Sequence, residues 1–343
     1  MTSTPMLTIC IPTYNRADCL EMLLDALRVE LGTLQGLVRV VIGDNASTDR
    51  TPEVTRAFAA AMPDALVLRH ERNLGPDENF CRCIAEVATE HFWIIGDDDL
   101  PRPGLIAAML PMLERAAPDL LYINSKDMGD VTEADREALS PGSLDAASLD
   151  RRAFASLIHV GMTFVSGCVI RRRFAPNDGL RRFTGTHLVQ LGWVFEALAQ
   201  GQRFVHVRTP AVFATAGNRG SYAVLRVFGD SFQRIAREVF VADKASRRIG
   251  ELIVSRTSIY FLPSVVWALR QATLGDFDRS ERAAAAMQSQ LGGSLIYRLL
   301  VLPLESLPTL PARALMALNG IIGRFVSLYD RANARLRGAL RPL

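Results

Sequence analysis

The sequence of 343 residues contains no uncharged apolar run of about 18 residues, the length that a membrane-spanning helix needs. Its first residues, MTSTPM, pass directly into a predicted strand, so we expect no signal peptide. The formal net charge is only +3, which gives no electrostatic argument for nucleic acid as a partner. We therefore expect a cytoplasmic protein whose contact with a membrane, if it has one, is made at the membrane surface.

Cysteine is scarce and shows no pairing pattern. The five cysteines are Cys10, Cys19, Cys81, Cys83 and Cys168. Their number is odd, and one residue between Cys81 and Cys83 is too short a gap for a zinc knuckle. We expect free thiols in a reducing compartment.

Apolar runs alternate with segments of helical spacing through the first 125 residues. Strands are predicted at residues 6–11 (ended by Pro12), 38–42, 65–68, 92–95 and 120–123, and helices at residues 20–31, 52–62, 80–87 and 104–113. This alternation predicts an α/β fold with a mostly parallel central sheet and helices on both faces. Ligands of such sheets bind beyond the carboxyl ends of the strands.

The remainder of the chain divides into a mixed part and a helical part. Residues 126–150 are polar and predict a mobile loop over the site. A strand is expected at residues 164–170 and a helix at residues 189–198. From about residue 222 the pattern is helical, which predicts one domain at residues 1–220 and a helical extension at residues 221–343.

Polar loops follow the first strands at the points where these strands end. They lie at residues 13–16, 44–49, 69–75 and 97–99, and we expect them to converge on one rim of the sheet. The last of them follows a strand and places Asp97, Asp98 and Asp99 in a row. Three adjacent carboxylates repel one another unless a cation lies between them. A divalent cation held there would neutralise a diphosphate.

Four motifs in this order resemble the family 2 glycosyltransferases, which have the A-type nucleotide-sugar fold. The motifs are IPTYNR at residues 11–16, DNASTD at 44–49, NLG at 73–75 with Asn79, and GDDD at 96–99. A further run, SGCVIRR at residues 166–172, resembles an element on the acceptor side of the family. Within the family, the GDDD form and this run are most similar to the abequosyltransferase-type enzymes of O-antigen and cell-surface glycan synthesis.

The resemblance implies a donor site in the first half of the domain, at residues 1–125. It assigns nucleotide binding to Pro12, Thr13, Tyr14, Arg16, Asp44, Asn73, Gly75 and Asp97. Asp44 would accept a hydrogen bond from the base, although an Asx-turn or helix cap is the alternative. Arg16 suits a diphosphate, and Tyr14 would either stack on the base or pack against the protein.

The resemblance also implies a metal, Mg²⁺ or Mn²⁺, and an acceptor site in residues 126–220. Asp98 would hold the metal most directly, Asp99 would assist or line the donor pocket, and Asp97 would touch ribose or metal. The acceptor would contact Ser166, Gly167, Arg171 and Arg172. These arginines would meet phosphates of a donor or a lipid-linked acceptor, unless they form a solvated basic face.

An inverting transfer needs a base that deprotonates the acceptor hydroxyl. Relatives carry an acidic pair at the start of the helix that follows the acceptor strand. Residues 183–188 read FTGTHL here, so the acid is missing and His187 stands in its place. Histidine titrates near neutral pH, and His187 is either the base or an acceptor-binding residue. Asp178 and Glu196 are the alternative bases.

The C-terminal segment is basic and amphipathic. Residues 312–343 hold six arginines against Asp330 alone, a charge of +5 from six minus one. Apolar residues recur in steps of three and four at Leu315, Leu318, Ile322, Phe325, Tyr329, Ala332 and Leu336. Such a helix suits an anionic membrane surface, with a helix packed on the protein or a dimer seam as alternatives. We expect a protein peripheral to the inner face of the cell membrane.

Together these patterns predict an inverting, metal-dependent glycosyltransferase. It would move a hexosyl or deoxyhexosyl group from a nucleoside-diphosphate donor to a hydroxyl of a glycan or lipid-linked oligosaccharide in surface polysaccharide synthesis. One alternative is an inactive sugar-nucleotide-binding scaffold at the membrane, which the missing acid keeps open. A nucleotidyltransferase is the other, and the lack of glycine in residues 11–16 counts against its phosphate loop.

Overall fold

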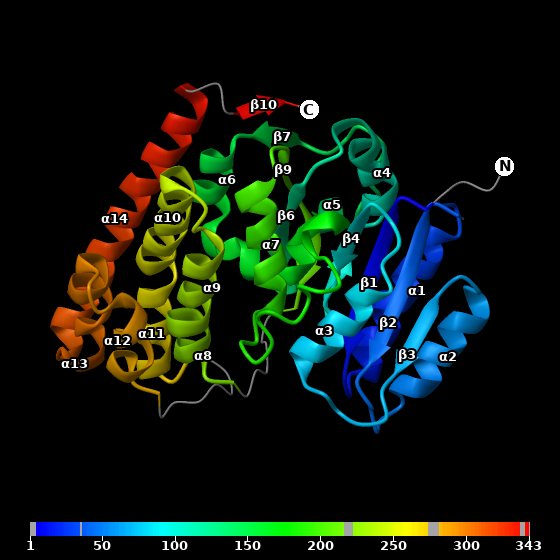
Figure 1. Cartoon of the computed structure of the whole chain (residues 1–343), viewed down its shortest axis with the longest axis horizontal. Coiled ribbons are helices and arrows are strands. Elements are labelled where there is room, and N and C mark those ends of the chain that lie inside the picture. Colours follow the sequence, from blue (N-terminus) through cyan, green and yellow to red (C-terminus); the bar gives the residue numbers. More distant parts are fainter. Residues whose placement is uncertain (1–4, 35, 216–221, 274–280, 337–339, 343) are drawn as a thin grey trace.

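A computed structural model describes residues 5–34, 36–215, 222–273, 281–336 and 340–342. The strands are β1 (Leu7–Thr13), β2 (Val38–Asp44), β3 (Leu66–Arg69), β4 (His91–Ile94), β5 (Leu100–Pro101), β6 (Leu120–Asp127), β7 (Ala146–Leu149), β8 (Cys168–Arg171), β9 (Phe204–Ala214) and β10 (Leu340–Pro342). They form one sheet in the order β10-β7-β9-β6-β8-β4-β1-β2-β3, with β5 paired to β9 (Figure 1).

The sheet is mixed and mostly parallel. Strands β1, β2, β3, β4, β6, β9 and β10 run in one direction, whereas β5, β7 and β8 run in the other. The carboxyl ends of β1, β2, β3, β4 and β9 therefore meet at one edge. Because β8 is antiparallel, it begins at that edge and leads away from it. The expected strand at residues 164–170 is shorter, since Val165–Gly167 form a 3₁₀ turn instead.

Helices cover both faces of the sheet, as the sequence predicts. Residues on alternate positions of each strand enter two hydrophobic clusters; in β1, Leu7, Ile9 and Ile11 enter one and Cys10 enters the other. The first five helices are α1 (Ala17–Leu31), α2 (Thr51–Ala61), α3 (Pro76–Ala85), α4 (Leu105–Ala116) and α5 (Glu133–Arg136). Helices α1, α2 and α4 pack on one face, and α3 packs on the other with α6 (Arg151–Ile158) and α7 (Val189–Gln200).

Strand β1 shows how local chemistry sets a boundary. Pro12 does not end the strand, as expected from the sequence, because the strand continues to Thr13. The pairing of β1 with β4 ends at Cys10, so Pro12 pairs only with Gly43 of β2. A residue without an N–H group is tolerated where one neighbouring strand is absent.

The prediction of a mobile loop at residues 126–150 is wrong. This segment begins in β6, contains α5, and returns to the sheet as β7, which pairs with β9. Lys126 holds Asp135 at 2.6 Å, and the Thr132 side chain caps α5. These polar residues pair with one another and lie away from the cavities described below.

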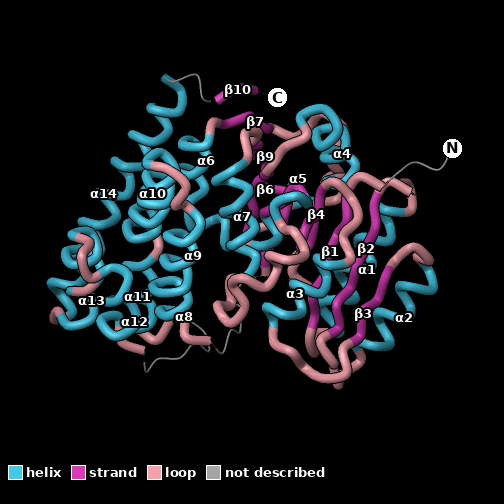
Figure 2. The backbone as a smooth tube through the Cα atoms, viewed as in Figure 1, coloured by secondary structure: helices cyan, strands magenta, loops and turns pink. Residues whose placement is uncertain are grey.

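The chain after residue 222 is helical, as predicted, until β10. Its helices are α8 (Val224–Arg226), α9 (Phe232–Val239), α10 (Lys244–Tyr260), α11 (Leu262–Arg270), α12 (Ala283–Leu291), α13 (Pro303–Ser306) and α14 (Thr309–Leu336). They gather at the end of the molecule opposite β1–β3 (Figure 2). The predicted boundary at residue 220 falls in residues 216–221, outside the described residues, and the helices after it share the cluster that covers α7.

One helical stretch of the described chain is long and apolar enough to cross a membrane. It covers Lys244–Arg270, and its most apolar window of 18 residues has a mean hydropathy of 1.5 and is 44% buried inside the protein. Core helices of soluble proteins meet the same criteria, so length and composition alone decide little here.

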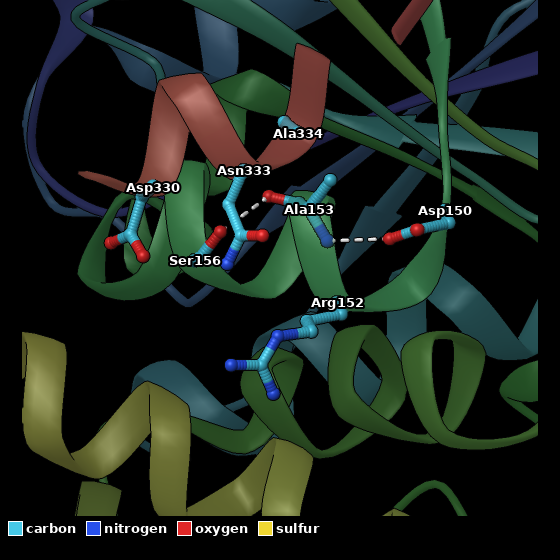
Figure 3. Close-up of a pocket in the computed structure, with 7 residues that line it drawn as sticks. All are labelled: Asp150, Arg152, Ala153, Ser156, Asp330, Asn333 and Ala334. Carbon is cyan, nitrogen blue, oxygen red and sulfur yellow. Dashed lines mark hydrogen bonds between the residues drawn. The ribbon is translucent and has the colours of Figure 1, made fainter. Parts of the chain in front are cut away.

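Helix α14 is held to the body of the protein along its inward side. Figure 3 shows Asp330, Asn333 and Ala334 of α14 against Ala153 and Ser156 of α6, around a cavity of about 10 Å³. That volume holds a single water at most. Next to it, Arg256 of α10 donates two hydrogen bonds to Asp330, at 2.6 and 2.7 Å.

This Arg256–Asp330 pair tests the attachment of α14. Its side chains are only 11% and 6% exposed. Asp330→Ala leaves the arginine buried and unpaired, which should lower the free energy of unfolding by roughly 3–5 kcal/mol. Urea denaturation measures this, and the apolar double variant Arg256→Met/Asp330→Leu should recover most of the loss. An Asp330→Ala protein as stable as the wild type would contradict a structural role for the pair.

Candidate active site

Four loops meet at the carboxyl edge of the sheet, as the sequence predicts. The Thr13 hydroxyl donates to Asp97 Oδ2 at 2.7 Å, which joins the end of β1 to the loop after β4. Arg16 Nη1 lies 3.4 Å from Asp97 Oδ1 and also pairs with Asp98 Oδ2. Asp97 and Asp98 thus share one guanidinium, whereas Asp99 is bonded to the Ser166 hydroxyl.

Asparagine side chains tie the other two loops to this edge. Asn45 Nδ2 donates to Asn73 Oδ1 at 2.9 Å and to the Gly75 carbonyl at 3.2 Å. Asn79 Nδ2 donates to the Gly43 carbonyl at 2.8 Å, so the start of α3 is fixed against β2. Gly75 has φ +84°, a backbone conformation that favours glycine and lets the chain turn into α3.

A small cleft of about 240 Å³ opens between these loops. Its lining contains six of the eight residues predicted to bind a nucleotide: Pro12, Thr13, Tyr14, Arg16, Asn73 and Asp97. No binding role was predicted for the other four lining residues, which are Asn45, Pro76, Asn79 and Phe80. Asn79 belonged to a motif, but the proline and phenylalanine resemble ordinary helix residues in sequence. The Tyr14 side chain is 42% exposed, so its ring face is open to a ligand.

Asp44 and Gly75 do not line the small cleft. Asp44 is 1% exposed, and its carboxylate accepts from Ser47 N at 2.8 Å and from Arg69 Nη1 at 2.7 Å. The alternative reading of Asp44, as the anchor of a turn, is the arrangement in the structure. For Asp44 to contact a base as predicted, Arg69 would have to release the Asp44 carboxylate. Gly75 contributes through its backbone carbonyl, which accepts a hydrogen bond from Asn45 Nδ2.

Burial sets the electrostatics of the aspartate run. Desolvation raises the pKa of Asp97 to about 6, although the Thr13 hydroxyl and Arg16 favour its charged form. Desolvation also raises the pKa of Asp99 to about 6 against the hydrogen bond from Ser166. The Asp98 side chain is 26% exposed and reaches open space. Asp98 is therefore the carboxylate placed to meet a ligand.

The carboxylates fit a cation that is bound mainly by its ligand. Among the described residues, no three His, Cys, Asp or Glu side chains form a set that could hold a metal. Mg²⁺ usually takes one or two protein carboxylates and completes its shell with substrate phosphates and water. Asp98, with Asp97 and Asp99 beside it, fits that mode of binding. Arg16 now neutralises Asp98 and would share it with such a cation.

A large cavity of about 1,020 Å³ adjoins the small cleft, and Arg16, Pro76 and Phe80 line both. The aspartate run contributes Asp98 and Asp99 to its wall. The start of α7, the end of β9 and the residues just before β8 form other parts of the wall. The acidic residues thus stand where two cavities of different size meet.

His187 lies in the wall of the large cavity, just before α7. Its backbone has φ +59°, and its ring stacks on Tyr222 with 5.5 Å between the centroids. The backbone N–H groups of Thr186 and His187 both donate to Asp77 Oδ2 at 3.0 Å. The carboxylate of Asp77, from the first turn of α3, therefore caps α7 and holds the backbone of His187.

This role of Asp77 was not predicted from the sequence, because an acid in the first turn of a helix is usually a cap of that same helix. Here it serves another helix, 110 residues further along the chain. Its side chain is buried, 8% exposed, and reaches the cavity wall. A carboxylate does lie at the start of α7, although the acid expected there in sequence is missing.

The sequence model of Glycosyl transferase family 2 matches residues 8–178, which include every element of the rim. This chain belongs to that family. Its A-type fold agrees with solved structures: S. aureus TarS 1–349 has a TM-score of 0.58 at 16% identity, covering 96% of this chain and 92% of that one. The mannosyltransferase PcManGT from Pyrobaculum calidifontis, in complex with GDP-Man and Mn²⁺, has a TM-score of 0.54 at 17% identity, covering 96% and 85%.

Two curated relatives match part of this chain in sequence. Abequosyltransferase RfbV of Salmonella typhimurium is 32% identical over 126 residues, 36% of this chain and 37% of that protein. Succinoglycan biosynthesis protein ExoA of Rhizobium meliloti is 36% identical over 98 residues, 29% of this chain and 28% of that protein. The matches span about a third of the length of these relatives.

Two predicted acceptor residues, Ser166 and Gly167, are buried and support the family's aspartate run instead. Ser166 is 0% exposed; its hydroxyl donates to Asp99 Oδ2 at 2.5 Å and accepts from Gly96 N at 2.8 Å. A Cβ at Gly167 would lie 2.9 Å from the Tyr122 ring. Neither residue lines the large cavity, and their predicted contact with an acceptor stays a prediction.

Arg171 and Arg172, which were also predicted to contact the acceptor, do not line the large cavity. Strand β8 runs away from the rim, and Arg171 pairs with His91 at the start of β4. Arg171 forms ion pairs with Glu90 and Asp119, and Arg172 Nε donates to the Val87 carbonyl at 3.2 Å. Both arginines therefore lie at the opposite end of β4 from Asp97–Asp99.

The alternative bases are not in the wall of the large cavity. Asp178 is exposed in the turn after Phe174. Glu196 lies on α7 but accepts hydrogen bonds from Arg182 at 2.9 Å and Gln200 at 2.6 Å. Of the three candidates, only His187 lines the cavity, and its role as the base stays a prediction.

The buried carboxylates predict a pH-dependent stability. Asp97 and Asp99 have folded pKa values of about 6 against 3.8 in the unfolded chain. Between these pH values the folded protein binds more protons, so the free energy of unfolding falls as pH rises from about 4 through 6. Asp99→Asn should therefore stabilise the protein by roughly 2 kcal/mol at pH 8 and hardly at pH 4. Denaturation at both pH values, with exposed Asp25→Asn as control, measures this; equal effects at both would contradict it.

Proposed function

We propose that this protein transfers a sugar from a nucleoside-diphosphate donor to a hydroxyl of a glycan or lipid-linked oligosaccharide, with inversion at the anomeric carbon. The observation that carries the proposal is the position of Arg16 and the aspartates between a small cleft and a large cavity. Two adjoining sites, one for a nucleotide and one for an extended acceptor, are what a transfer between two substrates needs.

The small cleft suits the nucleotide. Tyr14 offers an exposed ring face for a base, and asparagine amides surround it with donors and acceptors. Arg16 lies at the exit toward the large cavity, where a diphosphate emerging from the cleft meets its guanidinium. Complexes of TarS with UDP and UDP-GlcNAc, and of PcManGT with GDP-Man, support a nucleotide-sugar donor.

The metal proposed here is Mg²⁺ or Mn²⁺, held by Asp98 with help from Asp99 or Asp97. When bound, it would neutralise the diphosphate and stabilise the charge that develops on the leaving nucleotide. The Mn²⁺ in the PcManGT complex supports this assignment. Arg16 supplies a second positive charge at the same place, and it becomes free to pair with phosphate oxygens when Asp98 binds another partner.

His187 is the proposed base. A neutral ring nitrogen of His187 takes the proton of the acceptor hydroxyl, and the oxygen attacks the anomeric carbon from the face opposite the leaving diphosphate. Asp77 fixes the backbone of His187 and Tyr222 stacks on its ring. The base is therefore held in position before the acceptor binds, so less ordering of the side chain is needed to reach the transition state.

The acceptor class follows from the size of the large cavity and from the relatives. About 1,020 Å³ is ample for several sugar units, whereas a small hydroxyl compound needs far less. An abequosyltransferase and a succinoglycan biosynthesis protein match about a third of this chain. Both names support a role in the synthesis of a surface polysaccharide.

The first test of the proposed function concerns nucleotide binding and the role of Asp98. CDP, UDP, GDP and dTDP are titrated into the protein by calorimetry, with Mn²⁺ or with EDTA. One of them should bind at least about tenfold more tightly with Mn²⁺, a difference of roughly 1.4 kcal/mol. In Asp98→Asn this dependence on Mn²⁺ should disappear, because the carboxylate that faces the ligand is lost.

The matched control is Asp25→Asn, an isosteric change of an exposed aspartate on α1. It should bind like the wild type. Metal-independent binding in the wild type, or an undiminished Mn²⁺ effect in Asp98→Asn, would contradict the role of Asp98 while leaving the nucleotide cleft in place.

The second test of the proposed function concerns His187 and Asp77. The measured quantity is the release of nucleoside diphosphate from the sugar nucleotide that binds. His187→Ala should lower kcat by roughly 10²–10⁴ with little change in donor affinity. Asp77→Ala should also lower kcat, because the backbone of His187 loses its anchor. Asp178→Asn and Glu196→Gln, both outside the cavity wall, should remain close to the wild type.

The outcome separates the rival assignments. An active His187→Ala with an inactive Asp178→Asn or Glu196→Gln would make a carboxylate the base. A wild type that binds the nucleotide sugar but neither hydrolyses nor transfers it, with acceptor-lipid extracts supplied, would identify an inactive scaffold and reject the proposed activity.

A further inference from the structure

Helix α14 exposes a row of large apolar side chains. Six of the twelve exposed large hydrophobic residues of the described chain belong to this one helix: Leu310, Leu318, Ile321, Phe325, Leu328 and Tyr329. They are between 49% and 77% exposed. We call them the outward stripe. Single exposed apolar residues are common on proteins, but such a concentration marks an interaction surface.

The inward side of α14 carries buried polar groups beside apolar residues that pack on the core, such as Ala312 and Ala334. Asn319 and Asp330 are buried, and Asn319 Nδ2 donates to the Ile259 carbonyl at 2.9 Å. Tyr260 of α10 donates to the Gly323 carbonyl at 3.0 Å. A helix that only packs on a water-soluble protein turns its apolar side inward. In α14 large apolar side chains point to solvent while polar groups bind the body of the protein.

The stripe is presented by a fixed element. Segment η6 (Tyr297–Val301) and α13 contact α14 near its start. After its end the chain returns to the sheet as β10, which pairs with β7. In Figure 1, α14 forms the edge of the molecule farthest from β1–β3. The outward stripe is therefore held in place rather than carried on a loose tail.

Positive charge borders the outward stripe on one side. At about 100° per residue, Leu318, Ile321, Phe325, Leu328 and Tyr329 fall within an arc of about 100°, and the arginines of α14 fall within the next 60° or so. These arginines, all exposed, are Arg313, Arg324, Arg331 and Arg335. The only acid of α14, Asp330, is buried against Arg256.

We propose that the outward stripe and its arginine border dock α14 on an anionic membrane surface. Apolar side chains would enter the boundary of headgroups and acyl chains, and the arginines would meet lipid phosphates. A second copy of the chain on the same face would bring eight arginines, four from each copy, into one interface without an exposed acid of α14. Anionic lipid neutralises this charge, whereas a second copy adds to it.

The stripe differs in part from the one predicted from sequence. Leu318, Phe325 and Tyr329 are exposed as expected, whereas Leu315 and Ile322 are partly buried. Ile321 and Leu328 take their place. The inward side of the helix packs on the protein, which was one of the alternatives, and its other side remains open.

Flotation with lipid vesicles tests the proposal on the full chain. The wild type should float with vesicles of phosphatidylcholine and phosphatidylglycerol at low salt, and hardly with phosphatidylcholine alone. Phe325→Glu/Leu328→Glu should lower the floated fraction by about tenfold or more. Arg324→Ser/Arg331→Ser should weaken binding to anionic vesicles by roughly 25-fold, since each arginine near such a surface contributes a factor of about five.

The matched control is Met22→Glu/Val29→Glu, which places the same charges on two apolar residues of α1 that are 57% and 73% exposed. It should float like the wild type. All variants are first compared with the wild type in melting temperature and nucleotide binding, and Phe325→Ser replaces the double variant if that fails to fold.

Two results would overturn the proposal. One is a wild type that does not float, or a control pair that loses flotation as completely as the Phe325/Leu328 pair. The other is a dimer in analytical ultracentrifugation that Phe325→Glu/Leu328→Glu converts to monomers, which would assign the stripe to a second copy. Both readouts are independent of glycosyl transfer, so they stand whether or not the proposed activity is confirmed.

Discussion

The burial of negative charge at the rim constrains the rest of the site. Asp97 and Asp99 are each 7% exposed, and desolvation raises their pKa values to about 6. Their charged forms persist because hydroxyl groups from distant segments donate to them and Arg16 lies beside Asp97 and Asp98. Burying carboxylates that Arg16 compensates only in part costs stability, and a cation bound beside them would reduce that cost.

The same constraint explains the hydrogen bonds that neighbouring segments make to the aspartate run. Ser166 bridges Gly96 and Asp99, and the Thr215 hydroxyl donates to the Asp98 carbonyl at 2.5 Å. The chain before β8 and the end of β9 are thereby fixed to the aspartate run. Parts of the large cavity are built on these two segments. The shape of the large cavity therefore depends on hydrogen bonds made to the aspartate run.

Sequence predicted the rim well because each of its loops directly follows a strand, and parallel strands end together. It failed where direction or distance in space decides. Arg171 and Arg172 follow Ser166 closely in sequence, but the antiparallel course of β8 carries them to the far end of the sheet. Asp77 reaches α7 across 110 residues, a pairing that no local spacing announces. Residues 126–150 have loop-like composition, yet β7 finds its partner in β9.

Helix α14 shows another feature that a sequence pattern alone does not predict. A periodic stripe reveals that a helix has two different sides, but it does not reveal which side faces the protein. Here Arg256 and Tyr260 of α10 supply polar partners for Asp330 and Gly323, so the side of α14 that carries these groups turns inward. Phe325 and Leu328 face solvent in this orientation. The ion pair and the apolar surface are thus one feature, since the buried partner on α10 determines the rotation of α14 about its axis.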